Sequence, residues 1–262
     1  MSTIKDDLAQ LIRSSTAGIV DVELAATAWS ASRSAAAMRL ARLTKQGWLT
    51  RLRRGVYYAL PLESARADET TIADPWLVAS KVFAPCYVAG WSAAEHWGLT
   101  EQLFRSTFVA TTAHIRERQQ ILFGAEYHLA RITPDRLEGL ATVWRGSTRV
   151  ALSSPERAIV DAMRTPSWIG GVRHLEEVLV RWSELKNRSE QKLIGELRAH
   201  GNGAAAKRLG LMAERVLGEA SPLVAQCLAM RSAGVIKLDP GVKERGRLNS
   251  RWRIWVNVSL SA

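Results

Sequence analysis

The side chains best equipped for chemistry in this sequence are cations, and they gather near its N-terminal end. From Leu43 to Pro61 the chain reads LTKQGWLTRLRRGVYYALP, with four lysines or arginines and no acid. Guanidinium and ammonium groups donate to phosphate oxygens, and an arginine can also bind a guanine base through two hydrogen bonds. The stretch therefore indicates contact with a polyanion; the alternative is a solvated hairpin that happens to be basic.

The segment before this stretch predicts a helix with two different faces. In SRSAAAMRLARLTKQG a helical projection places Ala36, Leu40 and Leu43 on the natural core side, and Gly47 ends the helix. The opposite face is small near its start and cationic near its end, which suits a recognition helix. An ordinary solvated face is the alternative. The candidate DNA contacts on this face are Arg33, Ser34, Met38, Arg42 and Lys45.

These five candidates have different expected roles in DNA binding. Arg33 and Ser34, at the start of the helix, are suited to direct base readout, and Met38 to a thymine methyl group. Arg42 and Lys45 lie further along and are suited to phosphates.

Two β-like runs, WLTRL and VYYAL, follow the helix and flank RRG, which predicts a hairpin or wing. Gly55 relieves the backbone strain of the turn. On the period-two rule, apolar residues of one parity pack inward, and we expect these to be Trp48, Leu52, Val56 and Tyr58. The cations then point outward or crown the turn, where they hold phosphates by charge. The candidate contacts of the wing are Arg51, Arg53 and Arg54.

Elements upstream complete a recognisable order. TIKDDLAQLIRSS has the apolar spacing of an amphipathic helix, and DVELAATA predicts a short helix capped by Asp21. Three helices and a hairpin within about 60 residues predict a winged helix-turn-helix. We therefore expect a DNA-binding domain over residues 1–62, a polar linker over 63–74 and a C-terminal domain over 75–262.

The sequence of the expected C-terminal domain predicts both helices and strands. A helix begins at Asp74-Pro75, strand-like runs continue to about residue 152, and amphipathic helices follow from SSPERAIVDAMR onward. VIKLDP and RWRIWVNVSL return to strand at the end. The expected fold class is α+β, an N-terminal winged helix-turn-helix followed by a mixed α/β domain.

A second group of cations lies in this terminal segment. If RWRIWVNV is a strand, Arg251 and Arg253 share one face and Trp252, Ile254 and Val256 the other. The group is either a second DNA-contacting or partner-facing patch, or a charged outer face over a tryptophan-rich core. Its members are Lys243, Arg245, Arg247, Arg251 and Arg253.

Composition supports a nucleic-acid partner more than an enzyme. The 262 residues carry a net charge of +11, mostly at the two ends, which favours a polyanionic partner. Cys86 and Cys227 are far apart in apolar settings, and the five histidines are scattered without metal-ligand spacing, so we expect no metal, no cofactor and no catalytic site. No signal peptide or 18-residue apolar run is present, and we expect a cytoplasmic protein with no membrane contact.

Several stretches together resemble the AbiEi-type antitoxins of bacterial type IV toxin-antitoxin systems. The first is LTKQGWLTRLRRGVYYALP, which resembles the end of their winged helix. The others, in chain order, are CYVAGWSAAEHWGLTEQ, VALSSPERAIVDAMRTPSWIGGVRHLEEVL, AAAKRLGLMAERVLG and LDPGVKERGRLNSRWRIWVNV.

The resemblance implies a specific function. Members of this family neutralise an AbiEii-like nucleotidyltransferase toxin encoded beside them, in systems of phage defence. They also bind inverted repeats in promoter DNA through the N-terminal domain and so repress their own operon. Carried onto this sequence, DNA binding belongs to the residues named above before position 62, and neutralisation to the part after residue 75. The alanine-rich segment ELAATAWSASRSAAAM departs from the expected pattern and offers few side chains for base readout.

Two other functions stay open on the sequence alone. One is a winged-helix transcription regulator whose C-terminal domain senses a ligand or an unrelated partner. The other is an enzyme that uses the basic ends to hold a nucleic acid or partner protein as substrate.

Overall fold

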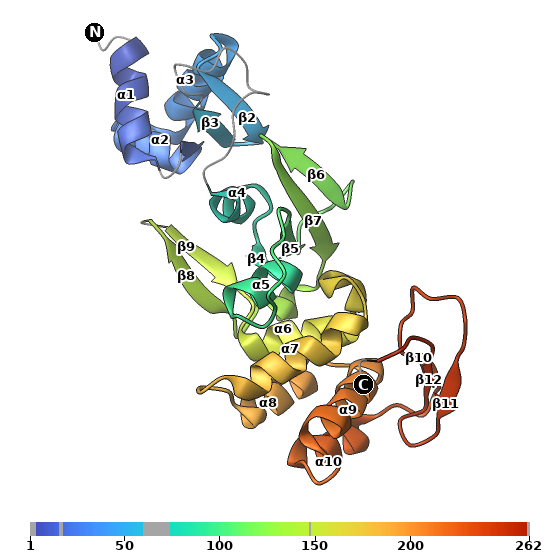
Figure 1. Ribbon diagram of the computed structural model, residues 1–262. Coiled ribbons are helices and arrows are strands. Elements are labelled where there is room, and N and C mark those ends of the chain that lie inside the picture. The colour runs from blue at the N-terminus through green and yellow to red at the C-terminus, as the bar shows by residue number, and fades with distance from the viewer. Residues whose placement is uncertain (1–3, 16–17, 60–73, 147, 261–262) are drawn as a thin grey trace. The chain divides into compact units, whose positions relative to one another are not determined.

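A computed structural model describes residues 4–15, 18–59, 74–146 and 148–260 (Figure 1). Its contacts divide the chain into two compact units. The first contains Met1–Tyr87, Arg105–Leu137 and Thr142–Ala151, and the second contains Val88–Phe104, Glu138–Ala141 and Leu152–Ala262. The first unit thus joins the predicted winged helix to part of the chain after residue 75. The predicted linker, 63–74, lies outside the described residues except for Asp74.

The N-terminal part of the first unit is a winged helix, as predicted. Helices α1 (Ile4–Ser14), α2 (Val22–Ala28) and α3 (Arg33–Lys45) precede the hairpin of β2 (Leu49–Arg53) and β3 (Val56–Ala59). The side chain of Asp21 accepts a hydrogen bond from the Leu24 amide at 2.9 Å and so caps α2. A three-residue strand that the sequence did not indicate, β1 (Ile19–Asp21), pairs with β3 and completes a sheet of order β1-β3-β2.

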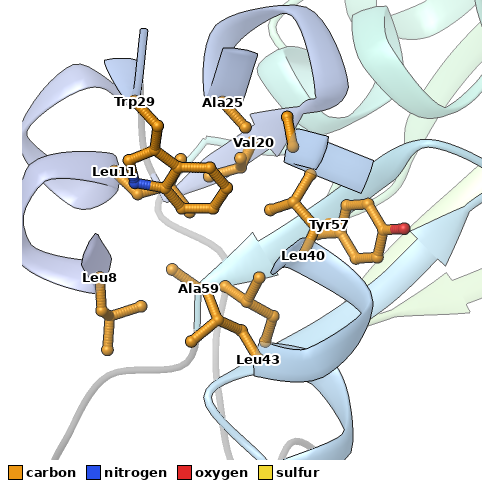
Figure 2. Close-up of a cluster of buried hydrophobic side chains, with 11 residues drawn as sticks. Leu8, Leu11, Val20, Ala25, Trp29, Leu40, Leu43, Tyr57 and Ala59 are labelled. Atoms are coloured by element: carbon orange, nitrogen blue, oxygen red, sulfur yellow. The ribbon is translucent and has the colours of Figure 1, made fainter. Parts of the chain in front are cut away.

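The core of the winged helix fills the space between its three helices and the sheet (Figure 2). Ala36, Leu40 and Leu43, the predicted core face of α3, are at most 2% exposed. The Trp29 indole donates to the backbone oxygen of Asp7 at 3.0 Å, which ties α2 to α1. This buried face fixes the opposite face of α3 toward solvent.

The prediction of which hairpin residues pack against the helices is wrong in part. The register of β2 with β3 pairs Leu49 with Ala59 and Arg51 with Tyr57. Leu49, Tyr57 and Ala59 belong to the core formed with the helices. Tyr58 points the other way, with its ring 4.9 Å from that of Phe123. The reason is that β3 is the central strand and is covered on both faces, so burial does not reveal which parity meets the helices.

A six-stranded mixed sheet, nearly all of it in the first unit, follows the winged helix in sequence (Figure 1). Helix α4 (Pro75–Val82) precedes it and begins at Asp74, as predicted. The strand order is β6-β7-β5-β4-β9-β8, with β5 parallel to β7, β4 parallel to β9 and β6 antiparallel to β7. The strands are β4 (Cys86–Val88), β5 (Thr107–Thr111), β6 (Gln119–Leu122), β7 (Ala125–Arg131), β8 (Ala141–Arg145) and β9 (Thr148–Leu152), with a 3₁₀ turn, η2 (Pro134–Leu137), before β8.

The second unit is mainly helical, and with the sheet it makes the fold α+β, as predicted. Its elements begin with α5 (Gly90–His96), α6 (Pro155–Arg164), the 3₁₀ turn η3 (Pro166–Ile169) and α7 (Arg173–Glu184). They continue with α8 (Glu190–His200), α9 (Gly203–Leu217), α10 (Pro222–Met230) and a small sheet of β10 (Ile236–Lys237), β12 (Ile254–Val256) and β11 (Arg247–Asn249). None of the helices in the described ranges is long and apolar enough to cross a membrane.

The terminal sheet corrects one prediction. The strand expected over RWRIWVNV begins only at Ile254, because Asn249 accepts a hydrogen bond from the Trp252 amide at 3.0 Å and turns the chain between β11 and β12. Arg251 and Arg253 therefore lie in a turn and do not share a strand face. Trp252 and Ile254 are fully buried, as predicted.

Two cations of helix α9 hold the terminal segment. The Arg208 guanidinium donates to the backbone oxygens of Leu238 at 2.8 Å, Met163 at 2.9 Å and Lys237 at 3.1 Å. Lys207 is buried and donates to the Gly234 oxygen. Both cations are buried and bound to backbone oxygens, so they do not contribute to the positive charge of the surface.

Candidate nucleic-acid interface

The start of α3 is built by a serine cap. The Ser32 side chain accepts a hydrogen bond from the Ala35 amide at 3.2 Å, and its hydroxyl lies 3.1 Å from that of Ser34. A serine cap leaves the next residue, Arg33, as the first of the helix. Arg33 and Ser34 are exposed there, at the helix end that a recognition helix presents to bases.

The end of α3 turns through a glycine, as predicted. The Gly47 amide donates to the Thr44 oxygen at 3.1 Å and the Trp48 amide to the Leu43 oxygen at 3.0 Å, the two bonds of a Schellman motif. Gly47 has a φ of 80°, which favours a residue without Cβ. The turn fixes the path from the helix into β2 and hence the position of the wing relative to α3.

The wing is anchored at its tip. Gly55, with a φ of 80°, accepts a hydrogen bond from the Val22 amide at 3.2 Å, so the turn of the hairpin is tied to the first residue of α2. Arg51 and Arg53 are exposed on β2, with an irregular register between them, and Arg54 lies in the turn. An anchored wing presents its cations in defined directions.

Helix α3 and the wing enclose a groove of about 1000 Å³, here called the wing groove. It brings together four of the predicted DNA contacts, Arg33 and Ser34 from α3 and Arg51 and Arg54 from the wing. The remaining lining residues, which the sequence did not single out, are Val22, Ser32, Ala37, Gly55 and Tyr57.

The other predicted contacts lie outside this groove. Met38 is 69% exposed, and Arg42 and Lys45 are exposed further along α3. Arg53 donates to the backbone oxygen of Ala84 at 3.3 Å and does not line this groove. The structure therefore separates the eight candidates into a groove set and a flanking set.

The wing groove is cationic with little internal compensation. None of its lining residues is an acid. Arg33 forms an ion pair with Glu23 of α2, but both side chains are more than 60% exposed, so solvent screens the pair. Within the described residues, no carboxylate pairs with Arg51 or Arg54. Two guanidinium groups thus face the groove without a competing anion.

Two of the five cations in the second basic group make contacts within the fold, and three do not pair with an acid among the described residues. Arg251 pairs with Glu214 at 3.0 Å and Glu219 at 3.2 Å, and Arg253 donates to the Ala233 oxygen at 2.7 Å. In the part of the chain that the structure describes, no acid pairs with the remaining three, which are exposed. They are Lys243, Arg245 and Arg247.

The loop that carries Lys243 and Arg245 is held by polar contacts to its backbone. The Asn257 amide group donates to the oxygens of Asp239, Val242 and Glu244, and the Lys237 ammonium donates to the oxygens of Val242 and Lys243. The loop therefore has a defined shape without using its own cations. We call residues 239–246 the basic loop.

The two cysteine side chains are not activated for chemistry. Burial raises the pKa of Cys86 to about 12, although Arg53 opposes it, and burial raises the pKa of Cys227 to about 12 as well. At neutral pH both are thiols rather than nucleophilic thiolates. Across the described ranges, no group of three His, Cys, Asp or Glu side chains could hold a metal ion.

Comparison with known families bears directly on the winged helix. Residues 7–59 match a family model described as a transcriptional regulator, AbiEi antitoxin. The match covers the winged helix and does not extend to the rest of the chain. The resemblance predicted from the sequence is thereby confirmed over this segment, which contains every residue of the wing groove.

Beyond this AbiEi segment the comparisons concern fold only. The crystal structure of the RV2827C protein from Mycobacterium tuberculosis is similar, with a TM-score of 0.58 over 94% of this chain and 88% of that one. Sequence identity is 16%, so the likeness is one of fold alone. None of the curated proteins compared with the chain matches it.

Proposed function

We propose that this protein is an antitoxin and autorepressor of an AbiE-like type IV toxin-antitoxin system. In this role it binds inverted repeats in the promoter of its own operon and neutralises an AbiEii-like nucleotidyltransferase toxin. It acts in the cytoplasm, has no catalytic activity of its own, and serves in phage defence.

The wing groove is the observation that carries the DNA part of the proposal. A helix start with short side chains, Ser34 and Ala37, allows close approach to base edges, while Arg51 and Arg54 face the same space from the wing. Duplex DNA carries one phosphate charge per about 1.7 Å of axis, so two unpaired guanidinium groups in one groove are matched to it. Arg33 is assigned to base readout and the wing arginines to the backbone.

The antitoxic part of the proposal rests on the family of the winged helix and on the later stretches that resemble the same family. The basic loop has a defined shape and exposes Lys243 and Arg245 to such a partner, with Asp239 and Glu244 of the same loop balancing their formal charge. It is assigned here to the toxin or to nucleic acid bound with it.

The second candidate function, a regulator with a ligand-sensing C-terminal part, is favoured by one cavity. The second unit contains a cavity of about 670 Å³ beside the start of α6. Its lining includes Trp97, Glu156 and Arg157, and Arg157 is paired with Glu196 at 2.9 Å. A small polar ligand there would make the protein a sensor rather than an antitoxin.

Co-expression separates the two candidates. The neighbouring gene is expressed with and without this protein, and growth is scored. We expect arrest without the protein and rescue with it. Normal growth of cells that carry the neighbour alone would remove the antitoxin proposal and leave the sensor.

DNA binding is tested by mobility shift of the promoter fragment with the full-length protein. We expect a shift that weakens steeply as salt is raised, because phosphate contacts release counterions. A protein that is folded but shifts no promoter DNA in dilute salt would contradict the autorepressor assignment.

A further inference from the structure

A second basic cavity, of about 490 Å³, adjoins the wing groove. The two share Val22, Arg33, Arg54 and Gly55, so they are continuous at the wing tip. We call this second space the hairpin cavity. Part of its wall comes from outside the winged helix, from Ser80 and Lys81 of α4 and from Thr148 and Arg149 of β9.

The hairpin cavity has a surplus of free positive charge. Its acids are Asp21 and Glu23, and both are occupied, Asp21 by the Leu24 amide and by Lys81 at 3.0 Å, and Glu23 by Arg33. Burial acts to raise the pKa of Asp21, but these hydrogen bonds and the Lys81 charge outweigh it and hold the pKa below its ordinary value. The Asp21–Lys81 pair thus stays charged and self-compensated at neutral pH.

Three arginines of the hairpin cavity have no such compensation. Among the residues that the structure describes, no carboxylate pairs with Arg53, Arg54 or Arg149. The Arg53 guanidinium donates to the neutral backbone oxygen of Ala84 at 3.3 Å. Three guanidinium groups around one cavity create the field that attracts a phosphate.

Arg149 is also positioned for such a contact. Its guanidinium lies over the ring of Trp144 at 4.8 Å from the centroid. Trp144 is 59% exposed, so the pair stands at the surface. Stacking orients the guanidinium plane while the N–H groups at its edge stay available to donate.

We propose that DNA bound in the wing groove continues into the hairpin cavity, where Arg149 together with Arg53 and Arg54 holds a backbone phosphate that flanks the half-site. The inference rests on the proposed DNA-binding function and extends the interface beyond residue 59, where the family match ends. A strand of the mixed sheet then contacts the same duplex as the winged helix.

The test uses the full-length protein and a labelled duplex from directly upstream of its gene, with fluorescence anisotropy at a series of KCl concentrations. Arg149→Ala is expected to weaken binding roughly tenfold, and to reduce the slope of log affinity against log salt by about 0.9, the loss of one phosphate contact. Because a phosphate carries no sequence information, a random duplex loses affinity by the same factor.

Two variants control for charge and for folding. Arg116→Ala removes an exposed cation of the same unit that lines neither cavity, and should leave the affinity and the slope unchanged. Arg149→Lys keeps the charge and should keep most of the salt slope. Circular dichroism and thermal melting of Arg149→Ala should match the unsubstituted protein, because the side chain is exposed.

The outcomes distinguish the inference from the function on which it rests. Loss of affinity in Arg54→Ala with unchanged affinity and slope in Arg149→Ala would overturn the hairpin-cavity contact and leave the autorepressor standing. Failure of the unsubstituted protein to bind any duplex would overturn both. Hydroxyl-radical footprints give an independent readout: Arg149→Ala should lose protection only at the outermost phosphates, and an identical footprint counts against the contact.

Discussion

Residues 1–60 carry nine cations and four acids, and residues 231–262 carry seven cations and two acids, so each end has the same formal surplus. In the winged helix, Arg51 and Arg54 face a groove without a carboxylate partner. In the terminal segment, Arg251 and Arg253 are held by two glutamates and a backbone oxygen.

The difference shows that a count of cations does not locate a polyanion site. What matters is how many guanidinium groups lack an internal carboxylate partner and whether a rigid element directs them to one space. By that measure the wing groove and hairpin cavity are the surfaces to which we assign the proposed DNA binding. The terminal segment is chiefly a structural one, with the basic loop as its exposed remainder. The following substitutions test this difference between the two ends of the chain.

The largest effect is expected from the buried cation that holds the terminal segment. Arg208→Met removes the guanidinium that donates to three backbone oxygens, two of these hydrogen bonds being buried, which should lower the free energy of unfolding by about 3 kcal/mol. Denaturant unfolding followed by circular dichroism measures it. Arg164→Met, at the exposed end of α6, is the matched control and should cost less than about 0.5 kcal/mol. Equal losses in both would remove the structural role given to Arg208.

Next in size is the wing. The double variant Arg51→Ala/Arg54→Ala should weaken promoter binding about 100-fold, two charge-assisted contacts at roughly tenfold each, with little change in melting temperature. Anisotropy titrations at one salt concentration measure it. Arg13→Ala, an exposed cation on α1 that lines neither cavity, should bind as the unsubstituted protein does. Unchanged promoter affinity in the double variant would contradict the proposed difference between the two ends of the chain.

A smaller effect should divide the terminal cations among themselves. Arg251→Ala removes contacts to Glu214 and Glu219 and should lower the free energy of unfolding by about 1 kcal/mol. Arg245→Ala, in the basic loop, should leave stability within about 0.5 kcal/mol of the starting value. Urea unfolding of the two variants side by side is the measurement. A greater loss from Arg245→Ala than from Arg251→Ala would reverse the assignment.

The smallest effect concerns the acid that occupies Arg33. Glu23→Gln removes the charge that pairs with Arg33, so the arginine is free for DNA and the affinity should rise about two- to threefold at low salt. The gain should shrink as salt increases, since the pair is exposed. Glu117→Gln, an exposed acid that lines neither cavity, controls for the change in net charge. Equal gains from both would mean that net charge rather than the Arg33 pair is responsible.

Local signals made the winged helix predictable. Asp21 and Asp74 each cap the helix that their position indicated, and Gly47 ends α3. Caps and glycine turns depend on a few neighbouring residues, so their chemistry is visible in sequence. The core face of α3 followed from its spacing for the same reason.

Long-range pairing was not predictable in the same way. The parity of β3 depends on β1, a three-residue strand with no pattern of its own, and on Phe123 far along the chain. Arg149 joins the hairpin cavity through the sheet and not through any motif near the winged helix. Burial of both faces hides the period-two signal, and contacts between distant segments leave no spacing to detect.

The central position of β3 has a consequence for the DNA binding that we propose. With partners on both edges, Tyr57 in the groove wall and Tyr58 packed on Phe123, the strand cannot shift toward α3 without breaking contacts on its other side. In the proposed complex, a groove of fixed width would penalise duplexes that must deform to enter it, so part of the selectivity would come from DNA stiffness and minor-groove width. Operators would then differ in affinity at base pairs that no side chain touches.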